Sequence, residues 1–122
     1  MARIIVIDDS WLLRLRIRKI LETADYEVEE AEGGNEGMDK IREGSFDCAI
    51  VDLLMPDVSG QDVLRSIRDE NINIPVIVST ADIQVSTRKN CEELGAVAFF
   101  PKPPQEDPLL LAVKQAIEYK TQ

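Results

Sequence analysis

The chain has 122 residues, of which 44% are hydrophobic and 30% are charged, and this length and composition are ordinary for one globular domain. Its 14 basic and 23 acidic residues give a net charge of −9, which argues against direct binding to nucleic-acid phosphates. Histidine is absent, which excludes a Ser-His-Asp or Cys-His nucleophile and a histidine-ligated zinc.

The hydrophobic segments are short. No apolar run approaches the ~18 residues that suggest a membrane span. The four apolar residues after Met1-Ala2-Arg3 are too few for a secretory signal. We therefore expect a cytoplasmic domain, without membrane insertion, that occupies residues 1–122. Cys48 and Cys91 lie in apolar or helical surroundings, which favours structural thiols over a redox pair.

Hydrophobic periodicity predicts that strands and helices alternate along the chain. Short apolar or alternating runs predict strands over residues 3–7, 27–31, 48–52, 75–80 and 98–100. Helical periodicity between these runs predicts helices over residues 10–24, 35–44, 60–70, 85–95 and 106–120. Continuously apolar strands that alternate with helices indicate an α/β fold, with a five-stranded parallel sheet and helices on both faces.

Two of the predicted helices have informative patterns. The apolar stripe of the helix over 10–24 contains Leu13, Ile17, Ile20, Leu21 and Ala24. We expect its basic residues to form a solvated face mostly off this stripe: Arg14, Arg16, Arg18 and Lys19. The helix over 85–95 has few apolar anchors, chiefly Val85, Cys91 and Leu94, so we expect low local stability there.

Polar residues follow several predicted strands at the point where each strand ends. Asp8 and Asp9 follow the first strand, Asp52 ends the third, Thr80 ends the fourth and Lys102 lies just past the fifth. Ligands of open α/β sheets bind outside the carboxyl ends of the strands. Three carboxylates there repel one another unless a cation joins them, and oxygen ligands suit Mg²⁺. Lys102 and Thr80 add a positive charge and a hydroxyl, which a transferring phosphoryl group requires.

Four motifs occur in a fixed order along the chain: IDDS (7–10), IVDLLMPDVSG (50–60), PVIVSTA (75–81) and FFPKP (99–103). With these motifs the chain resembles the response-regulator receiver domains of two-component signalling, and most closely the stand-alone chemotaxis (CheY-like) type. The resemblance spans the whole chain. It implies a single receiver domain with the flavodoxin-like strand order 2-1-3-4-5.

The resemblance also implies the chemistry of the acidic residues. Asp52 is the phosphoacceptor, a carboxylate nucleophile that attacks a phosphohistidine on a partner histidine kinase. Asp9 and Asp52 coordinate Mg²⁺ directly, together with the backbone carbonyl of Leu54. Asp8 coordinates the ion mostly through water.

Other matching residues are implied to hold the phosphoryl group and to carry the signal. Lys102 pairs with the phosphoryl oxygens, and Thr80 Oγ1 and the backbone amides of Leu53 and Ala81 donate to them. Thr80 and Phe99 form the switch. The surface made by the fourth helix, the fifth strand and the last helix is then expected to bind a downstream effector or a phosphotransfer protein.

The chain departs from the family pattern at several positions. Phe99 lacks the hydroxyl of the commoner tyrosine, and Leu54 is apolar where some relatives have a polar side chain. Pro101 precedes Lys102 in a strand that the implied order places at an edge, where a missing N–H is tolerated. Asp82 is expected to direct its carboxylate toward the phosphoryl region. The Lys102–Pro103 bond is expected to be cis.

Three functional classes are compatible with these residues. The first is a stand-alone receiver that signals through a bound partner, and the second is a relay intermediate that passes its phosphoryl group to another protein's histidine. The third, a Mg²⁺-dependent phosphohydrolase, is disfavoured because it requires a second carboxylate two residues past the nucleophile, where this chain has Leu54. We therefore expect no enzyme activity beyond the chain's own phosphorylation and dephosphorylation.

Overall fold

The computed structural model describes residues 1–120, in which five strands alternate with five helices. The strands are β1 (Arg3–Ile7), β2 (Glu27–Ala31), β3 (Cys48–Val51), β4 (Val76–Thr80) and β5 (Ala98–Pro101). The helices are α1 (Trp11–Thr23), α2 (Gly34–Glu43), α3 (Gly60–Asp69), α4 (Val85–Glu93) and α5 (Glu106–Lys120). Every predicted element is present, with small shifts at its ends. Among the described residues, no helix has the length and hydrophobicity needed to cross a bilayer.

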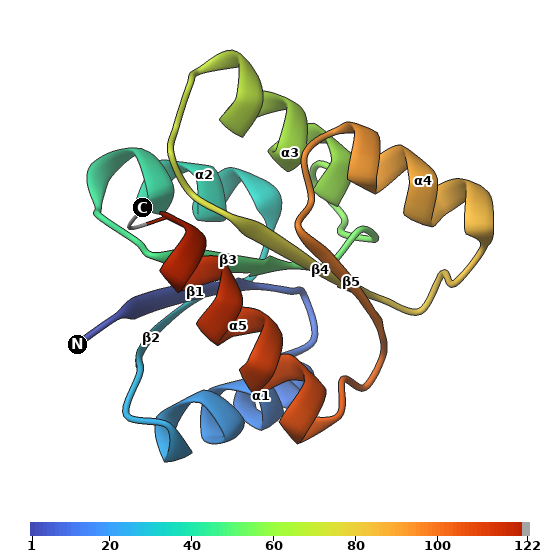
Figure 1. Cartoon of the computed structure of the whole chain (residues 1–122). Helices are drawn as coiled ribbons and strands as arrows, with labels where there is room; N and C mark the ends of the chain where they lie inside the picture. Colours follow the sequence, from blue (N-terminus) through green and yellow to red (C-terminus); the bar gives the residue numbers. More distant parts are fainter. Residues whose placement is uncertain (121–122) are drawn as a thin grey trace.

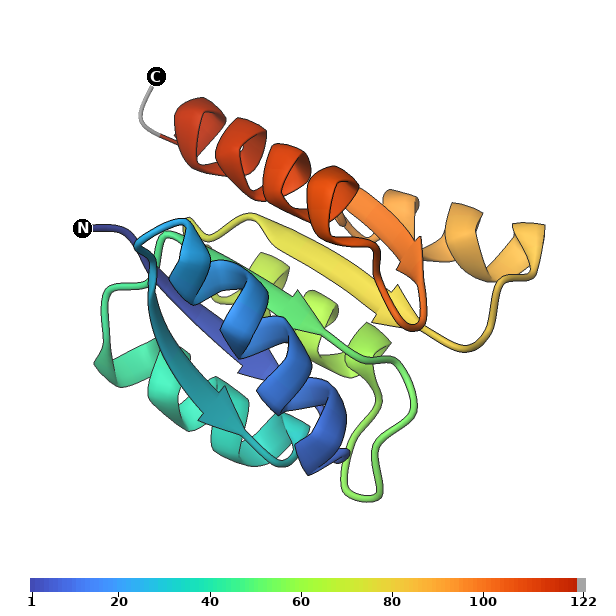
Figure 2. The same cartoon turned by 90° about the horizontal axis from the view of Figure 1, so that it is seen from below.

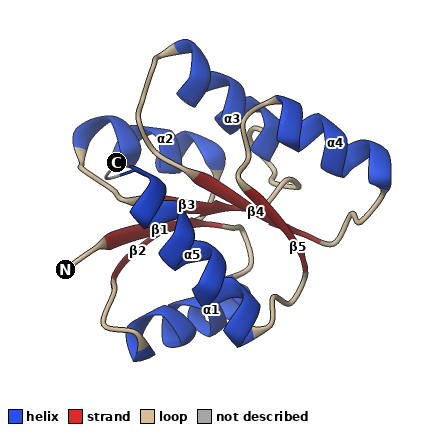
Figure 3. Cartoon of the chain, viewed as in Figure 1, coloured by secondary structure: helices blue, strands red, loops and turns tan. Residues whose placement is uncertain are grey.

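The strands form a parallel sheet in the order β2-β1-β3-β4-β5, which confirms the predicted topology. Helices α1 and α5 cover one face of the sheet, and α2, α3 and α4 cover the other (Figures 1 and 3). Figure 2 shows that the arrowheads of the strands all lie toward the same side of the molecule. The loops that follow the strands therefore meet at one edge of the sheet.

Alternation along the strands divides the core into two clusters. Ile5 and Ile7 of β1 belong to the cluster beneath α2, α3 and α4, whereas Ile4 of β1 belongs to the cluster beneath α1 and α5. Cys91 is buried in the first cluster and Cys48 in the second, and both are free thiols. Burial raises the pKa of Cys48 to about 12 and also raises the pKa of Cys91, which agrees with structural roles.

Helix α1 differs from its prediction at two positions. Ala24 lies beyond the helix and is exposed, whereas Arg14 is buried, with 7% of its surface accessible. The prediction of a solvated basic residue is therefore wrong at Arg14. Its guanidinium is compensated instead, because Nε donates to Glu30 at 2.9 Å and Nη1 donates to the carbonyl of Asp8 at 2.7 Å.

Helix α4 is thinly attached to the core. Cys91 is the one buried side chain among its nine residues, all of which are described. The prediction that Val85 anchors the helix is wrong, since 70% of Val85 is exposed in the first turn. Leu94, at the C-cap, is half-buried against the core. The anchoring of α4 is therefore even weaker than the sequence indicated.

Candidate functional site

The carboxyl edge of the sheet brings three predicted acidic residues together. Asp8 and Asp9 follow β1 and Asp52 follows β3, and one carboxylate oxygen from each lies within 4.8 Å of the others. Asp8 and Asp52 are buried, with 2% and 3% of their surfaces accessible, whereas Asp9 is exposed. One member of the cluster therefore faces solvent, and the other two need compensation for their burial.

Lys102, in the loop after β5, supplies that compensation. Its Nζ lies 2.9 Å from Asp8 Oδ2 and 2.9 Å from Asp52 Oδ2. The sequence predicted that Lys102 pairs with phosphoryl oxygens, and its contact with these two carboxylates was not predicted. The ammonium explains how two like charges can be buried side by side.

The electrostatics of the trio follow from burial and these contacts. Burial raises the pKa of the Asp52 carboxyl, and the charge of Asp8 adds to this rise, while the hydrogen bond from Lys102 opposes it. Burial favours the neutral amine of Lys102, but its hydrogen bonds to Asp8 and Asp52 outweigh this and hold its pKa above the ordinary value. Lys102 is therefore charged at neutral pH.

The cluster has the chemistry to hold a hard divalent cation. All of its side-chain donors are oxygens, which Mg²⁺ prefers. Opposite ligands on an octahedral Mg²⁺ are about 4.2 Å apart, because each Mg–O distance is about 2.1 Å. The three carboxylate oxygens, which all lie within 4.8 Å of one another, are therefore close enough for one ion to bridge them directly or through a water. Three carboxylates against one ammonium also leave an excess of negative charge for the ion to offset.

The loop from β3 to α3 is held close to Asp52. The backbone N–H of Asp52 donates to Ile7 O at 2.9 Å, and the N–H of Leu54 donates to Asp52 Oδ1 at 3.4 Å. Gly60, the first residue of α3, donates to Leu53 O at 3.0 Å, and a Cβ at Gly60 would lie 2.4 Å from the carbonyl oxygen of Asp52. Only glycine permits this approach. Leu53 is buried, and Leu54 is exposed.

The loop from β4 to α4 has a different arrangement from the one predicted. Thr80 is fully buried, and its Oγ1 accepts a hydrogen bond from the N–H of Asp82 at 3.2 Å. The carboxylate of Asp82 accepts from Gln84 N at 3.1 Å and from Thr87 Oγ1 at 2.9 Å. The prediction that Asp82 faces the phosphoryl region is therefore wrong, because the start of α4 uses both of its oxygens. Ala81, between the two, is exposed.

The β5 strand places the remaining predicted residues. Phe99 is half-buried and packs against the core cluster that Leu94 also contacts. Pro101 lies on the edge strand opposite Thr80, and the N–H of Lys102 donates to Thr80 O at 2.9 Å. The Lys102–Pro103 bond is cis, as predicted.

The role of Asp57 was not predicted from the sequence. Its carboxylate accepts hydrogen bonds from Gly34 N at 3.1 Å and Asn35 N at 2.9 Å, at the start of α2. Hydrogen bonds from backbone N–H groups, with Asn35 the largest contributor, lower the pKa of the Asp57 carboxyl. Helix α2 has Gly33 at its N-cap and therefore no side-chain cap of its own. The absence of a capping side chain at Gly33 was the one feature of the sequence that could have indicated a cap from elsewhere in the chain.

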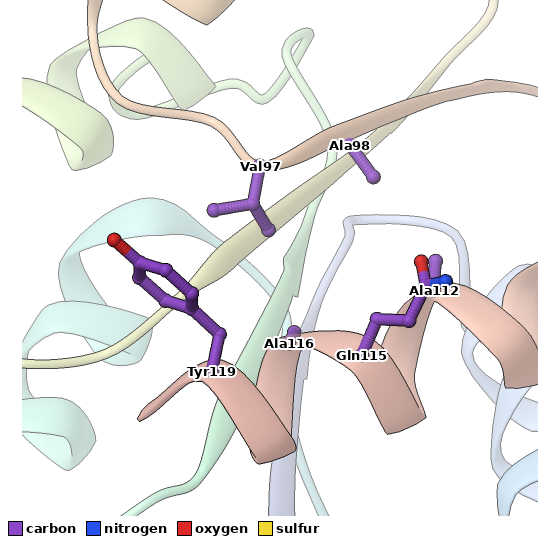
Figure 4. Close-up of a pocket in the computed structure, with 6 residues that line it drawn as sticks. All are labelled: Val97, Ala98, Ala112, Gln115, Ala116 and Tyr119. Carbon is purple, nitrogen blue, oxygen red and sulfur yellow. The ribbon is translucent and has the colours of Figure 1, made fainter. Parts of the chain in front are cut away.

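A separate apolar hollow of about 350 Å³ lies between the start of β5 and the last turns of α5. In Figure 4 the side chains of Val97 and Tyr119 face the same space. The residues that line it are Val97, Ala98, Ala112, Gln115, Ala116 and Tyr119. None of the predicted site residues is among these, so the hollow is distinct from the carboxylate cluster.

Comparisons with known proteins agree with this geometry. The family model described as "Response regulator receiver domain" matches residues 4–114. The chain is 33% identical over 120 residues to the response regulator MprA of Mycolicibacterium vanbaalenii, and the match covers 98% of this chain and 52% of that protein. The chain spans about half the length of the curated relatives it matches.

Solved structures of receiver domains have the same fold as this chain. A CheY-like response regulator receiver domain protein of Methanospirillum hungatei has a TM-score of 0.92 at 27% identity, covering 99% of this chain and 97% of that one. The response regulator TrrA of Thermotoga maritima, solved in complex with Mg²⁺-BeF, has a TM-score of 0.86 at 31% identity, covering 95% and 99%. The family model covers most of the chain, and the chain therefore belongs to the response regulator receiver domain family of two-component signalling.

Proposed function

We propose that Asp52 accepts a phosphoryl group from a phosphohistidine on a partner histidine kinase, with Mg²⁺ bound at the carboxylate cluster. The observation that carries this proposal is the buried Asp52 carboxylate, which shares the Lys102 ammonium with Asp8 at the carboxyl edge of the sheet. Nothing in the local fold requires a carboxylate there, and a phosphoacceptor does. The family to which the chain belongs and the Mg²⁺-BeF complex of TrrA support the same chemistry.

In the proposed step, an Asp52 carboxylate oxygen forms a bond to phosphorus as the P–N bond of the phosphohistidine breaks. The imidazole leaves with the electron pair of that bond. Asp9, Asp52 and the Leu54 carbonyl would hold Mg²⁺, with Asp8 through water, and the ion would supply positive charge to the phosphoryl oxygens. Lys102 Nζ lies 2.9 Å from an Asp52 oxygen, so it is close enough to form an ion pair with a phosphoryl oxygen once Asp52 is phosphorylated.

Further donors to the phosphoryl oxygens are the Thr80 hydroxyl and the backbone N–H groups of Leu53 and Ala81. Thr80 Oγ1 accepts a hydrogen bond from Asp82 N, so its own proton is available to donate. Asp82 in turn accepts from Gln84 and Thr87 at the start of α4. A displacement of Thr80 toward the phosphoryl group would therefore move Asp82 and the start of α4, a helix with little buried surface.

We place the output on the surface formed by α4, β5 and α5. The half-buried Phe99 responds to the movement of α4, and the apolar hollow beside Tyr119 offers a place for apolar side chains of an effector. A relay intermediate that transfers the phosphoryl group to a phosphotransfer protein is the alternative, and it shares the first step. Direct nucleic-acid binding has no part in the proposal, and a cytoplasmic location stays a prediction.

The experiment is incubation of the chain with acetyl phosphate and Mg²⁺, followed by intact-mass measurement. We expect one phosphoryl group per chain, its loss on hydroxylamine treatment and no labelling when EDTA replaces Mg²⁺. Asp52→Ala should not be labelled, whereas Asp57→Asn, on the same loop and outside the cluster, should be labelled normally. Persistent labelling of Asp52→Ala would overturn the assignment.

A further inference from the structure

Asp8 is fixed at each of its polar atoms. Its N–H donates to Ala31 O at 3.1 Å, and its Oδ1 accepts from Ser10 N at 2.9 Å. Its Oδ2 pairs with Lys102 at 2.9 Å, and its carbonyl oxygen accepts from Arg14 Nη1 at 2.7 Å. The last contact is charge-assisted, and it is the only one of the four that comes from a buried side chain of α1.

Arg14 is itself held in one orientation. Its Nε donates to Glu30 Oε1 at 2.9 Å, and its Nη2 lies 3.7 Å from Glu32 Oε1. The other oxygen of Glu30 accepts from Arg18, so β2 and α1 together fix the position of the guanidinium. A buried guanidinium that is bonded through both Nε and Nη1 is rigid, because this planar group loses little conformational freedom when its hydrogen bonds form.

We propose that Arg14 is a positioning residue that sets the geometry of the cation-binding carboxylates. The peptide plane that contains Asp8 O also contains the nitrogen and Cα of Asp9, so fixing the oxygen fixes the start of Asp9. Asp9 is the exposed member of the cluster, so its side chain is the least restrained by packing and depends most on a fixed backbone. This inference rests on the proposed function, since it requires that the cluster binds Mg²⁺.

Electrostatics and positioning make opposite predictions for Arg14, and this makes the inference testable. Loss of a positive charge near the carboxylates removes repulsion from an incoming cation and by itself strengthens binding. Loss of the contact with Asp8 O loosens Asp9 and weakens binding. Supporting residues behind metal ligands typically contribute about tenfold or more to metal affinity.

The experiment measures the Mg²⁺ dissociation constant by fluorescence of Trp11, the single tryptophan, two residues from Asp9 and largely exposed. The variants are Arg14→Lys, which keeps the charge and loses the planar fork, and Arg14→Met. The matched control is Arg18→Met, which removes the same charge from Glu30. Within residues 1–120, Arg18 contacts Glu30, Glu22 and Val28 O and does not bond Asp8. Circular dichroism is the control that checks whether each variant is folded.

We expect Arg14→Lys and Arg14→Met to raise the dissociation constant about tenfold. Arg18→Met should leave it unchanged or lower it. Wild-type affinity in Arg14→Lys, or equal effects of Arg14→Met and Arg18→Met, would overturn the inference and leave the proposed function standing. A wild-type chain that shows no Mg²⁺ binding at all would instead contradict the proposed function.

Discussion

The ammonium of Lys102 compensates the burial of Asp8 and Asp52, so removing the ammonium should lower the stability of the fold. Lys102→Met leaves the two carboxylates uncompensated. We expect it to lower the free energy of unfolding by about 3 kcal/mol in buffer with EDTA, as for other broken buried pairs. Mg²⁺ should restore more stability to this variant than it adds to the wild type, because the ion replaces the missing cation.

Urea denaturation with EDTA and with millimolar Mg²⁺ measures both effects of the Lys102 substitution. Lys114→Met, which removes one positive charge from an exposed position of α5, is the control for net charge. If Mg²⁺ stabilises Lys102→Met no more than it stabilises the wild type, Lys102 and the ion do not share the same carboxylates.

We expect Leu54 to affect how long a phosphoryl group would survive on Asp52. Water must reach the phosphorus in line, and Leu54, exposed two residues from Asp52, offers an apolar shield and no hydrogen bond. The carboxylate of Asp82 is bound at α4, so it does not compete for this role. We expect Leu54→Asn to shorten the phosphorylated state several-fold, a barrier change of about 1 kcal/mol.

The measurement for Leu54→Asn is the decay of the phosphoprotein after the donor is removed, at fixed Mg²⁺ and pH. Leu54→Met keeps an apolar side chain and should decay at the wild-type rate. Equal or slower decay in Leu54→Asn would show that Leu54 does not limit the access of water.

Among the elements, α4 and α3 differ in how firmly the core holds them. Helix α3 buries Gly60, Val63, Leu64 and Ile67, whereas α4 buries Cys91 among its nine described residues. We expect the amides of α4 to exchange with solvent faster than those of α3 in the unphosphorylated protein. Beryllofluoride with Mg²⁺, as a phosphoryl mimic, should change protection across residues 81–103.

Hydrogen exchange with and without beryllofluoride checks this expectation for α4. Helix α3 is the internal control, since its protection should change less. Unchanged protection across residues 81–103 would rule out α4 as the element that responds to the phosphoryl group.

Helix α2 depends on a carboxylate from another loop. Asp57 caps it, and the folded-state pKa of Asp57 lies below the ordinary 3.8. A depressed pKa means that the charge of Asp57 stabilises the fold above pH 3.8, and that this contribution is lost as the pH falls through the lower folded value. We expect Asp57→Ala to cost about 1 kcal/mol at pH 7, the usual worth of a cap, with a smaller difference near pH 3.

Urea denaturation of the wild type, Asp57→Ala and Asp57→Asn at pH 7 and pH 3 separates charge from hydrogen bonding. Asparagine accepts a hydrogen bond at every pH, so the difference between Asp57→Asn and Asp57→Ala should not change with pH. A wild-type advantage over Asp57→Ala that is as large at pH 3 as at pH 7 would contradict a role for the carboxylate charge.

For the whole molecule, the sequence pattern predicted the parallel α/β fold and the edge that carries the site, and the resemblance to receiver domains predicted the strand order. Strands and helices alternate with clear hydrophobic periods, and polar residues such as Asp52 follow apolar strands. The fold then brings these residues together, because parallel strands end at the same edge. Local pattern and overall fold agree there, as they do in sequences that fold to one structure.

The remaining details depend on partners that are distant in sequence. Hydrophobic periodicity shows that Arg14 is polar, but it cannot show that contacts with Glu30 and Asp8 O compensate the burial of its charge. In the same way, it cannot show that Asp57 caps α2 or that Asp82 is bound at α4. These residues are therefore the places where tertiary contacts override local expectation.

The assignment of Asp52 as the phosphoacceptor of this receiver domain can be tested at the level of the single residue. Borohydride reduces an aspartyl phosphate to homoserine, so reduction after incubation with a phosphodonor and Mg²⁺ marks the modified residue. Peptide mapping by tandem mass spectrometry should then find homoserine in place of Asp52, and unmodified aspartate at positions 8, 9 and 57. Homoserine at one of those other positions with an intact Asp52, or no homoserine in a chain that has gained phosphate, would contradict the assignment of Asp52.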